Sequence, residues 1–395
     1  MRLLVTGFLC AVLAATAALG YDAVYLKQDE WRLFDWLIQY EPEFIRRGLP
    51  GSLIFWLDET AGIDVRIGAL GLMLSAYAVF ILASLSVVRR IDTLWPYALL
   101  IFSPAVFLFQ IADRKAGFRK EVLFLALLAL LAAVFLSLRT ERGQFRALVA
   151  ALLVMPLLVL THEATVFYIP YLLFFGMLLT ITRARLAWTA GVLSLSGAAA
   201  IAVALHKGGP EDVPVLCAAI REALPPSRSL ELCETTSAIG WIGQSVEEAV
   251  AYRERNSAGL LRDLFPVIAL IGAAYPLALA DLARRLAVPR REWIALGLAV
   301  GVAVLASVVV FVLAINWGRF IYVHAAASAV LVFALAARHR ETGHAAGPPP
   351  APAVPVWAMI VPYALFWNVN NLNALVDRGI LMDALTVVGR LLRLG

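Results

Sequence analysis

Charged residues are scarce in this chain, and their scarcity excludes most classes of protein. Only 15% of the 395 residues are Asp, Glu, Lys or Arg, whereas 62% are hydrophobic and the mean hydropathy is +0.83. Soluble domains are about 25% charged and about 45–50% apolar, because their surfaces need polar coverage. A soluble enzyme and a disordered chain are therefore excluded, and a polytopic membrane protein is expected.

Cysteine and the common motifs of nucleotide and metal chemistry are also lacking. Three cysteines are too few for a disulfide framework. The sequence has no Walker loop, no pair of CxxC motifs, no GxSxG and no HExxH. We therefore expect no cofactor and no metal. The net charge of +5 does not suggest nucleic acid as a partner, and we attribute it to arginines in cytoplasmic loops.

Long apolar runs take the place of the missing charges. They are continuous rather than alternating, which argues against an outer-membrane barrel, and a span needs about 20 residues. We predict an all-α, polytopic integral membrane protein with about 11 transmembrane helices, forming a single helical membrane domain over residues 1–395. The runs lie at 3–20, 65–88, 94–112, 121–138, 147–161, 164–182, 187–205, 260–281, 293–315, 320–337 and 356–372.

Arginines in the short connections predict the orientation. If the N-terminus is cytoplasmic, the basic loops all fall on the cytoplasmic side, as the positive-inside rule requires. Residues 338–355, which are rich in proline, then form a cytoplasmic linker. The alternative for the first run is a cleaved signal peptide, and residue 21 starts outside in either case. The basic loops hold Arg89 and Arg90; Arg139, Arg142 and Arg146; Arg183 and Arg185; Arg284, Arg285, Arg290 and Arg291; and Arg338 and Arg340.

Two longer segments fall on the outer side. Residues 21–64 form the first outer loop, with an amphipathic segment, and residues 206–258 form the second. Cys217 and Cys233 lie in the second loop and can pair in an oxidising compartment. Such a bridge closes a loop of about 16 residues and contributes ~3 kcal/mol, although two free thiols are the alternative. Cys10 lies inside an apolar run, where we expect it to pack.

Four charged clusters occur at the predicted outer ends of the spans, where few cations are expected. Arginine presents a planar fork of donors that suits phosphate oxygens, and His and carboxylate side chains can act as acid or base. The clusters therefore predict a site for a charged substrate on the outer face. They are Asp29-Glu30-Trp-Arg with the following Glu41 to Gly51; Asp113 to Glu121; Thr161-His162-Glu163; and Asn316-Trp-Gly-Arg319.

Each cluster also has a purely structural explanation. Arg46 and Arg47 can reach lipid headgroups from an amphipathic segment. His162 and Glu163 can cap the following helix. Arg319 has no acidic neighbour in the sequence, so a structural ion pair would have to be long-range. The run from 113 to 121 can be a solvated turn, and His324 in an apolar helix is expected to be packed.

The order of these features resembles bacterial polysaccharide-assembly proteins with many spans, the EpsG-like and O-antigen-polymerase-like group. That group is similar in architecture to the lipid-dependent C-type glycosyltransferases. The resemblance implies an undecaprenyl-linked sugar donor and an acidic residue of the first outer loop near the acceptor, a position that Asp29 or Glu30 matches. Loop 206–258 departs from the pattern because it is small and rather acidic. The resemblance rests on Asp29-Glu30, Phe44-Ile-Arg-Arg-Gly-Leu, Arg119-Lys-Glu, His162-Glu163 and Trp317-Gly-Arg319.

The predicted function is transfer or polymerisation of glycan units from a polyprenyl-phosphate or diphosphate donor at the outer face of the bacterial inner membrane. Expected partners are the lipid-linked sugar donor, a glycan acceptor, membrane lipids and other polysaccharide-assembly proteins. One alternative is a transporter or flippase of an anionic lipid-linked substrate. The other is a non-catalytic assembly partner, in which the clusters would not meet. The predicted site consists of Arg46, Arg47, Arg114, Arg119, Lys120 and Arg319 for phosphate, and Asp29, Glu30, His162 and Glu163 for catalysis.

Overall fold

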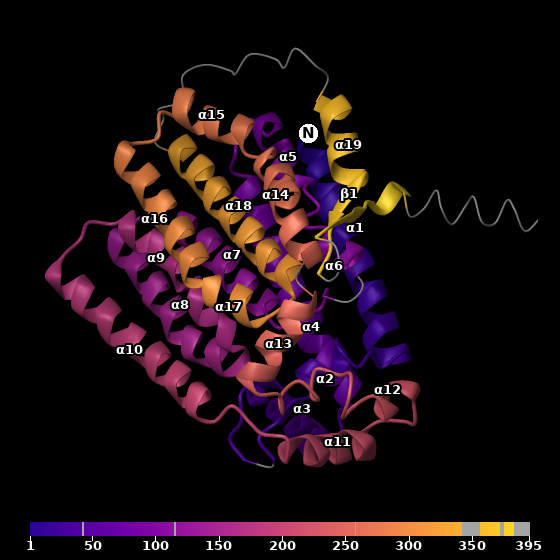
Figure 1. Cartoon of the computed structure of the whole chain (residues 1–395). Helices are drawn as coiled ribbons and strands as arrows, with labels where there is room; N and C mark the ends of the chain where they lie inside the picture. Colours follow the sequence, from indigo (N-terminus) through magenta and orange to yellow (C-terminus); the bar gives the residue numbers. More distant parts are fainter. Residues whose placement is uncertain (42, 114–115, 257, 342–355, 372–374, 383–395) are drawn as a thin grey trace, which may run out of the picture.

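The computed structural model describes residues 1–41, 43–113, 116–256, 258–341, 356–371 and 375–382 (Figure 1). The structure is 73% helical, which confirms the all-α prediction in its main part. The strands within the described ranges are β1 (Trp367–Val369) and β2 (Val376–Arg378), which pair as one antiparallel hairpin. The apolar, charge-poor sequence is therefore helical over most of its described length.

Six helices in the described part of the chain are long and apolar enough to cross a membrane, and a bent pair makes up to seven. This agrees with a multi-pass membrane protein but does not support about eleven spans. The six are α1 (Arg2–Gly20) continued by η1 (Tyr21–Leu26), α4 (Val65–Val88), α8 (Glu141–Thr161), α10 (Arg183–Leu205), α16 (Arg290–Ala306) with α17 (Val308–Leu313), and α18 (Trp317–Glu341). The bent pair is α14 (Ala258–Gly272) with α15 (Pro276–Arg284).

The predicted span at 94–112 is broken into three short helices: η2 (Trp95–Tyr97), α5 (Ala98–Ile101) and α6 (Phe109–Ala112). Proline explains the break. Pro104 lacks an N–H donor and disfavours the helical conformation at Ser103, which precedes it. Irregular backbone is tolerated at membrane depth only where protein buries it, and most residues of this segment are buried.

Several other apolar runs also form helices that are shorter than the run itself. Helix α7 (Val122–Ser137) has 16 residues, about 24 Å at 1.5 Å per residue, less than the roughly 30 Å of a bilayer core. The run at 164–182 becomes a 3₁₀ turn, η3 (Glu163–Tyr168), and α9 (Ile169–Met177), and the run at 356–372 becomes α19 (Val356–Leu365) and β1. Apolar length alone therefore does not distinguish a long spanning helix from these shorter elements.

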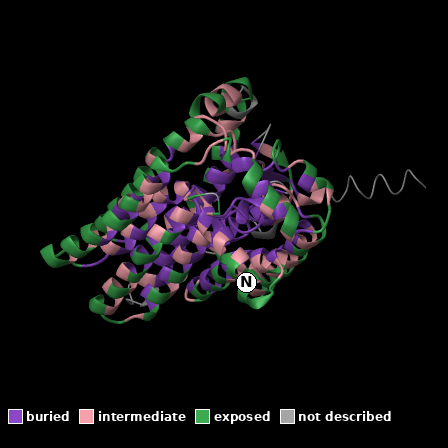
Figure 2. Ribbon diagram, turned by 90° about the horizontal axis from the view of Figure 1, so that it is seen from below, coloured by how far each residue is buried: buried purple, intermediate pink, exposed green. Residues whose placement is uncertain are grey.

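Helices α7 and α18 form the centre of the bundle, and α4, α8 and α9 pack around them. The spanning window of α18 is 89% buried, whereas those of α10 and α16–α17 are only 22% buried. Figure 2 shows the same division, with buried residues in the middle and exposed residues on the outer helices. Exposed apolar side chains such as Leu186, Trp188 and Ile201 on α10 are what lipid contact requires of a spanning helix.

The connections divide between two ends of the bundle. At one end, low in Figure 1, lie α2 (Leu33–Trp36), α3 (Gly48–Ala61), α11 (Asp212–Ala223) and α12 (Arg228–Glu231). At the other end lie the N-terminus and the basic turns, where Arg2 donates to Ile91 O and Arg185 pairs with Glu141. We call this second end the arginine-turn end. Helix α18 continues to Glu341, so the start of the predicted 338–355 linker is helical, and 342–355 lie outside the described residues.

The predicted disulfide between Cys217 and Cys233 is confirmed. The two Cα atoms are 5.9 Å apart, and the bridge joins α11 to the residues after α12. Both cysteines are fully buried. The prediction for Cys10 was wrong, because its side chain is exposed on α1 rather than packed.

Candidate functional site

Charged residues from all four predicted clusters meet at the end of the bundle opposite the arginine-turn end. The first outer segment supplies two of them, the start of α7 three, the α8–η3 corner two and α18 one. Every one of these side chains is linked to another of the group by an ion pair or hydrogen bond. We call this group the ion cluster: Asp35, Arg47, Arg119, Lys120, Glu121, His162, Glu163 and Arg319.

Glu121 is buried within the ion cluster and contacts side chains from two other segments of the chain. Its Oε1 is 3.0 Å from Arg319 Nε in the first turn of α18 and 3.3 Å from His162 Nε2 after α8. All three side chains are at most 5% exposed. Arg319 therefore has the long-range acidic partner that its sequence neighbourhood lacks.

Asp35 forms the second buried pair. Its Oδ2 lies 3.2 Å from Arg119 Nε, and Arg119 Nη1 donates to Trp31 O at 2.8 Å. Asp35 is fully buried and was not among the predicted site residues. A charge inside the apolar stretch Leu33 to Ile38 was the signal that could have found it, since burying an ion needs a partner.

Arg47 and Glu163 form the pair nearest to solvent. Arg47 Nε donates to both carboxylate oxygens, at 2.9 and 3.1 Å, and Nη2 also donates to Oε1. The Arg47 side chain is 17% exposed and that of Glu163 is 32% exposed. Lys120 Nζ donates to Arg47 O at 2.9 Å, so the backbone of Arg47 is held as well.

The electrostatics of the ion cluster follow from burial. Burial lowers the pKa of His162 to about 4, which leaves its ring neutral at pH 7. Burial also lowers the pKa of Lys120 to about 8, so this lysine remains largely charged. Burial alone would raise the pKa of Asp35, but Arg119 holds it below its usual range. Four cations thus face three carboxylates, which leaves an excess of positive charge.

Hydrogen bonding inside the ion cluster is incomplete. Both carboxylate oxygens of Asp35 and of Glu121 are buried and accept no hydrogen bond, although one oxygen of each lies at ion-pair distance from an arginine. Buried polar atoms are normally hydrogen-bonded. Such atoms in a native fold call for an explanation, and functional sites are one place where they persist.

The two acidic residues predicted from the resemblance lie outside the ion cluster. Asp29 Oδ1 accepts hydrogen bonds from the backbone N–H groups of Trp31 and Arg32, at 3.1 and 2.9 Å. Glu30 Oε2 accepts from Ser229 Oγ at 3.2 Å. Asp29 therefore shapes the first outer segment, and Glu30 attaches it to the second.

The remaining predicted cations differ in what they contact. Arg46 Nη2 donates to the backbone carbonyls of Trp241, at 3.0 Å, and Ile242, at 3.4 Å. It joins the first outer segment to the second, and no carboxylate among the described residues lies at ion-pair distance from it. Arg114 lies outside the described residues.

Gly318 precedes Arg319 and meets the backbone of another segment closely. A Cβ there would lie 2.0 Å from Asn370 O, so only glycine fits. The close approach presses the residues after β1 against the first turn of α18 and helps to position Arg319. His324, one turn deeper, is packed as expected, with Nδ1 2.8 Å from Tyr171 OH.

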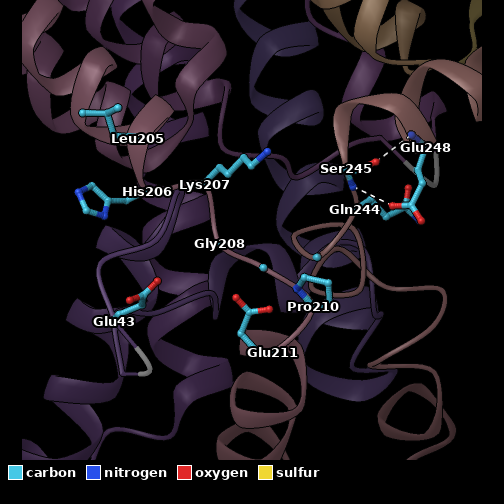
Figure 3. Close-up of a pocket in the computed structure, with 12 residues that line it drawn as sticks. Glu43, Leu205, His206, Lys207, Gly208, Pro210, Glu211, Gln244, Ser245 and Glu248 are labelled. Carbon is cyan, nitrogen blue, oxygen red and sulfur yellow. Dashed lines mark hydrogen bonds between the residues drawn. The ribbon is translucent and has the colours of Figure 1, made fainter.

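A wide cleft of about 500 Å³ lies beside the first outer segment (Figure 3). No motif in the sequence indicated this cleft. It is bordered by Glu43 on one side and by residues 205–211, 243–245 and 248 on the others. Arg46 connects this region to the ion cluster, since it directly precedes Arg47 in the chain and donates to Ile242 O, next to Gly243 of the cleft. The lining side chains are mostly exposed, unlike those of the ion cluster.

The described residues contain no group of His, Cys, Asp or Glu side chains that could hold a metal ion. The chain matches no protein-family model, no curated protein and no solved structure. The geometry of the ion cluster is therefore the basis for a functional proposal.

Proposed function

We propose that this protein transfers or polymerises glycan units from a polyprenyl-phosphate or diphosphate donor. An acceptor hydroxyl oxygen attacks the anomeric carbon, and the bond from that carbon to the phosphate oxygen breaks. The hydroxyl proton passes to a carboxylate of the protein. The phosphate leaves with added negative charge, which fixed cations stabilise in the transition state.

The observation that carries the proposal is the meeting of four distant segments in one buried ion cluster. Buried ion pairs are often no more stabilising than apolar residues of the same volume, and charges in a membrane protein usually mark function. A non-catalytic assembly partner predicts that the clusters remain apart, which disfavours that alternative.

The position of the ion cluster supports an outer-face reaction. The basic turns lie at the opposite end, which by the positive-inside rule is cytoplasmic. The Cys217–Cys233 bridge lies near the ion cluster, and disulfides belong to oxidising compartments. We retain the cytoplasmic N-terminus, the count of about eleven passes including short and broken ones, and the bacterial inner membrane as parts of this proposal.

The proposed roles follow from accessibility. Glu163 is the most exposed carboxylate of the ion cluster and is the proposed proton acceptor, with neutral His162 beside it. The excess positive charge of the ion cluster offsets the charge of the donor phosphate. Asp29 and Glu30 lie in the outer loop near the second outer segment and are proposed to act on the acceptor side.

The runner-up is a transporter or flippase for the same donor. Transporters place ionisable groups near the bilayer midplane, on broken helices. The break between α14 and α15, bent by 41°, carries none of the ion-cluster residues. Transfer is therefore the better supported proposal.

Deleting the gene that encodes this protein in its native host tests the proposal. We expect loss of a surface glycan and accumulation of its polyprenyl-linked precursor on the outer leaflet, detected by mass spectrometry of extracted lipids, with the leaflet assigned by treating intact cells with a membrane-impermeant glycan-modifying reagent before extraction. Wild-type protein and the Arg142→Ala variant, changed in an exposed turn of α8 at the arginine-turn end, should restore the glycan. A precursor confined to the inner leaflet would favour the flippase, and an unchanged glycan profile would contradict both.

A further inference from the structure

The cations of the ion cluster differ in whether a ligand can reach them. Arg119 and its partner Asp35 are 6% and 0% exposed, and Arg319 and Glu121 are 5% and 2% exposed. An incoming phosphate cannot reach these guanidinium groups without opening the helix contacts around them. They hold the fold of the site rather than its ligand.

Two other cations are occupied by backbone oxygens. Lys120 Nζ donates to Arg47 O, and Arg46 Nη2 donates to Trp241 O. Each of these bonds fastens one chain segment to another. Releasing either one to bind a ligand would loosen the site that the ligand enters.

Arg47 is the exception, because its partner is a solvent-accessible side chain. Glu163 presents two carboxylate oxygens to the Arg47 guanidinium through Nε and Nη2. This is the arrangement in which arginine binds two oxygens of a phosphate group. A carboxylate and a phosphate therefore compete for the same fork of donors.

The backbone of Arg47 is fixed while its side-chain partner can change. Arg47 has φ +68°, an uncommon value for a residue other than glycine, and its carbonyl is held by Lys120. Gly48 follows, packed so closely on Tyr40 that a Cβ would lie 2.2 Å from the ring. The guanidinium is thus presented from a rigid base, so ligand binding needs only movement of Glu163.

We propose that Glu163 occupies the phosphate site of Arg47 in the ligand-free protein and that the phosphate group of the substrate displaces it. This inference rests on the proposed function and names Arg47 as the cation that contacts the ligand. Displacement releases the Nε and Nη2 donors of Arg47, which then pair with two oxygens of the phosphate group. It also frees the Glu163 carboxylate beside the bound substrate, where the proposed transfer needs a proton acceptor.

Binding to the full-length protein in nanodiscs tests the exchange. The probes are undecaprenyl phosphate, inorganic pyrophosphate and phosphatidylglycerol, with affinity measured by titration of tryptophan fluorescence. Glu163→Gln keeps the shape of the side chain but removes the competing charge. We expect this variant to bind a phosphate probe at least tenfold more tightly than wild type. The probe that shows the gain identifies the source as a polyprenyl headgroup, a free phosphate or a general phospholipid.

Matched variants separate this exchange from a structural effect. Arg47→Gln should lose at least tenfold in affinity, and Arg47→Lys, which keeps the charge without the fork, should lose less. Glu141→Gln is the control, because Glu141 accepts from Arg185 at 2.8 Å in a similar pair at the arginine-turn end. Its affinity should equal that of wild type.

The outcomes distinguish the two proposals. Wild-type binding of undecaprenyl phosphate with no gain, or a loss, in Glu163→Gln overturns the exchange and leaves the proposed function standing. Absence of binding in wild type and in every variant overturns the proposed function and the exchange together. A gain in Glu141→Gln equal to that in Glu163→Gln also overturns the exchange, since the effect would then come from net charge alone.

Discussion

One arginine–carboxylate pair from each end of the bundle shows how a local ion pair differs from a buried long-range one, although long-range pairs such as Arg185 with Glu141 also occur at the arginine-turn end. At the arginine-turn end Asp281 and Arg285 are four residues apart on one helix, with Nε and Oδ1 2.6 Å apart, and Tyr97 OH donates to the same carboxylate. In the ion cluster, Arg319 and Glu121 come from different helices, and neither has a partner nearby in sequence.

The difference teaches what each kind of pair depends on. A pair between residues four apart forms as soon as its helix forms. Here it lies at the C-terminal end of α15. A pair between distant segments exists only in the complete fold, and breaking it leaves a charge buried without compensation. The ion cluster is therefore the region in which fold and proposed chemistry depend on each other.

The largest effect is expected from Arg319→Ala. This change leaves Glu121 buried and unpaired, and should lower the free energy of unfolding by about 3–5 kcal/mol. Thermal unfolding in detergent, with Arg185→Ala at the arginine-turn end as control, measures the loss. The control pair is 20% and 46% exposed and should cost about 0.2–1 kcal/mol. Equal losses in the two variants would contradict the distinction between the two ends.

The disulfide should give the next largest effect. Its two cysteines are 16 residues apart, and replacing both by serine should cost ~3 kcal/mol by the loop-entropy argument. Limited proteolysis should then cut residues 206–256 before the helical bundle. A wild-type protein whose proteolysis pattern does not change on reduction would show that the bridge contributes little.

A smaller effect is expected from pH. Burial lowers the pKa of His162 from 6.5 to about 4, so the unfolded chain binds more protons than the fold between these values. Stability should therefore be fully present above about pH 6.5 and fall as the pH drops toward 4. His162→Gln should flatten that part of the curve, measured by chemical unfolding at each pH. An unchanged slope would mean that His162 is protonated in the fold.

Accessibility of the two ends can be compared without changing stability. In a Cys10→Ala background, we expect Glu211→Cys to react with an impermeant thiol reagent in intact cells and Arg142→Cys to be protected. Both native residues are exposed, so the reagent can react with either cysteine whenever it has access to that side of the membrane. The reverse labelling pattern would invert the proposed orientation.

The sequence predicted the parts of this structure that depend on local composition. Continuous apolar runs predicted helices such as α4 and α8, and two cysteines in one polar segment predicted their bridge. The run at 94–112 was misjudged because apolar composition outweighed the effect of Pro104 on the backbone. A buried irregular segment and a spanning helix have the same hydropathy, so the pattern alone does not separate them.

The candidate site was predicted only in outline. Basic and acidic residues at span ends indicated where charge would collect, and Arg47, Glu163, Lys120 and Arg319 are indeed in the ion cluster. Which carboxylate pairs with which arginine depends on helix packing, which the sequence does not encode locally. Asp35 itself was marked locally, as a single charge in the apolar stretch Leu33 to Ile38, but its pairing with Arg119 depends on that packing.

The place of Arg319 late in the chain has a consequence for biogenesis. Asp35 and Glu121 are synthesised early, and Glu121 acquires its arginine only when α18, the most buried spanning helix, is inserted. Until then Glu121 lacks the arginine that pairs with it in the complete fold, so its carboxyl group has to remain hydrated or take up a proton. The insertion of α18 is therefore the step that allows Glu121 to be buried as a charged group.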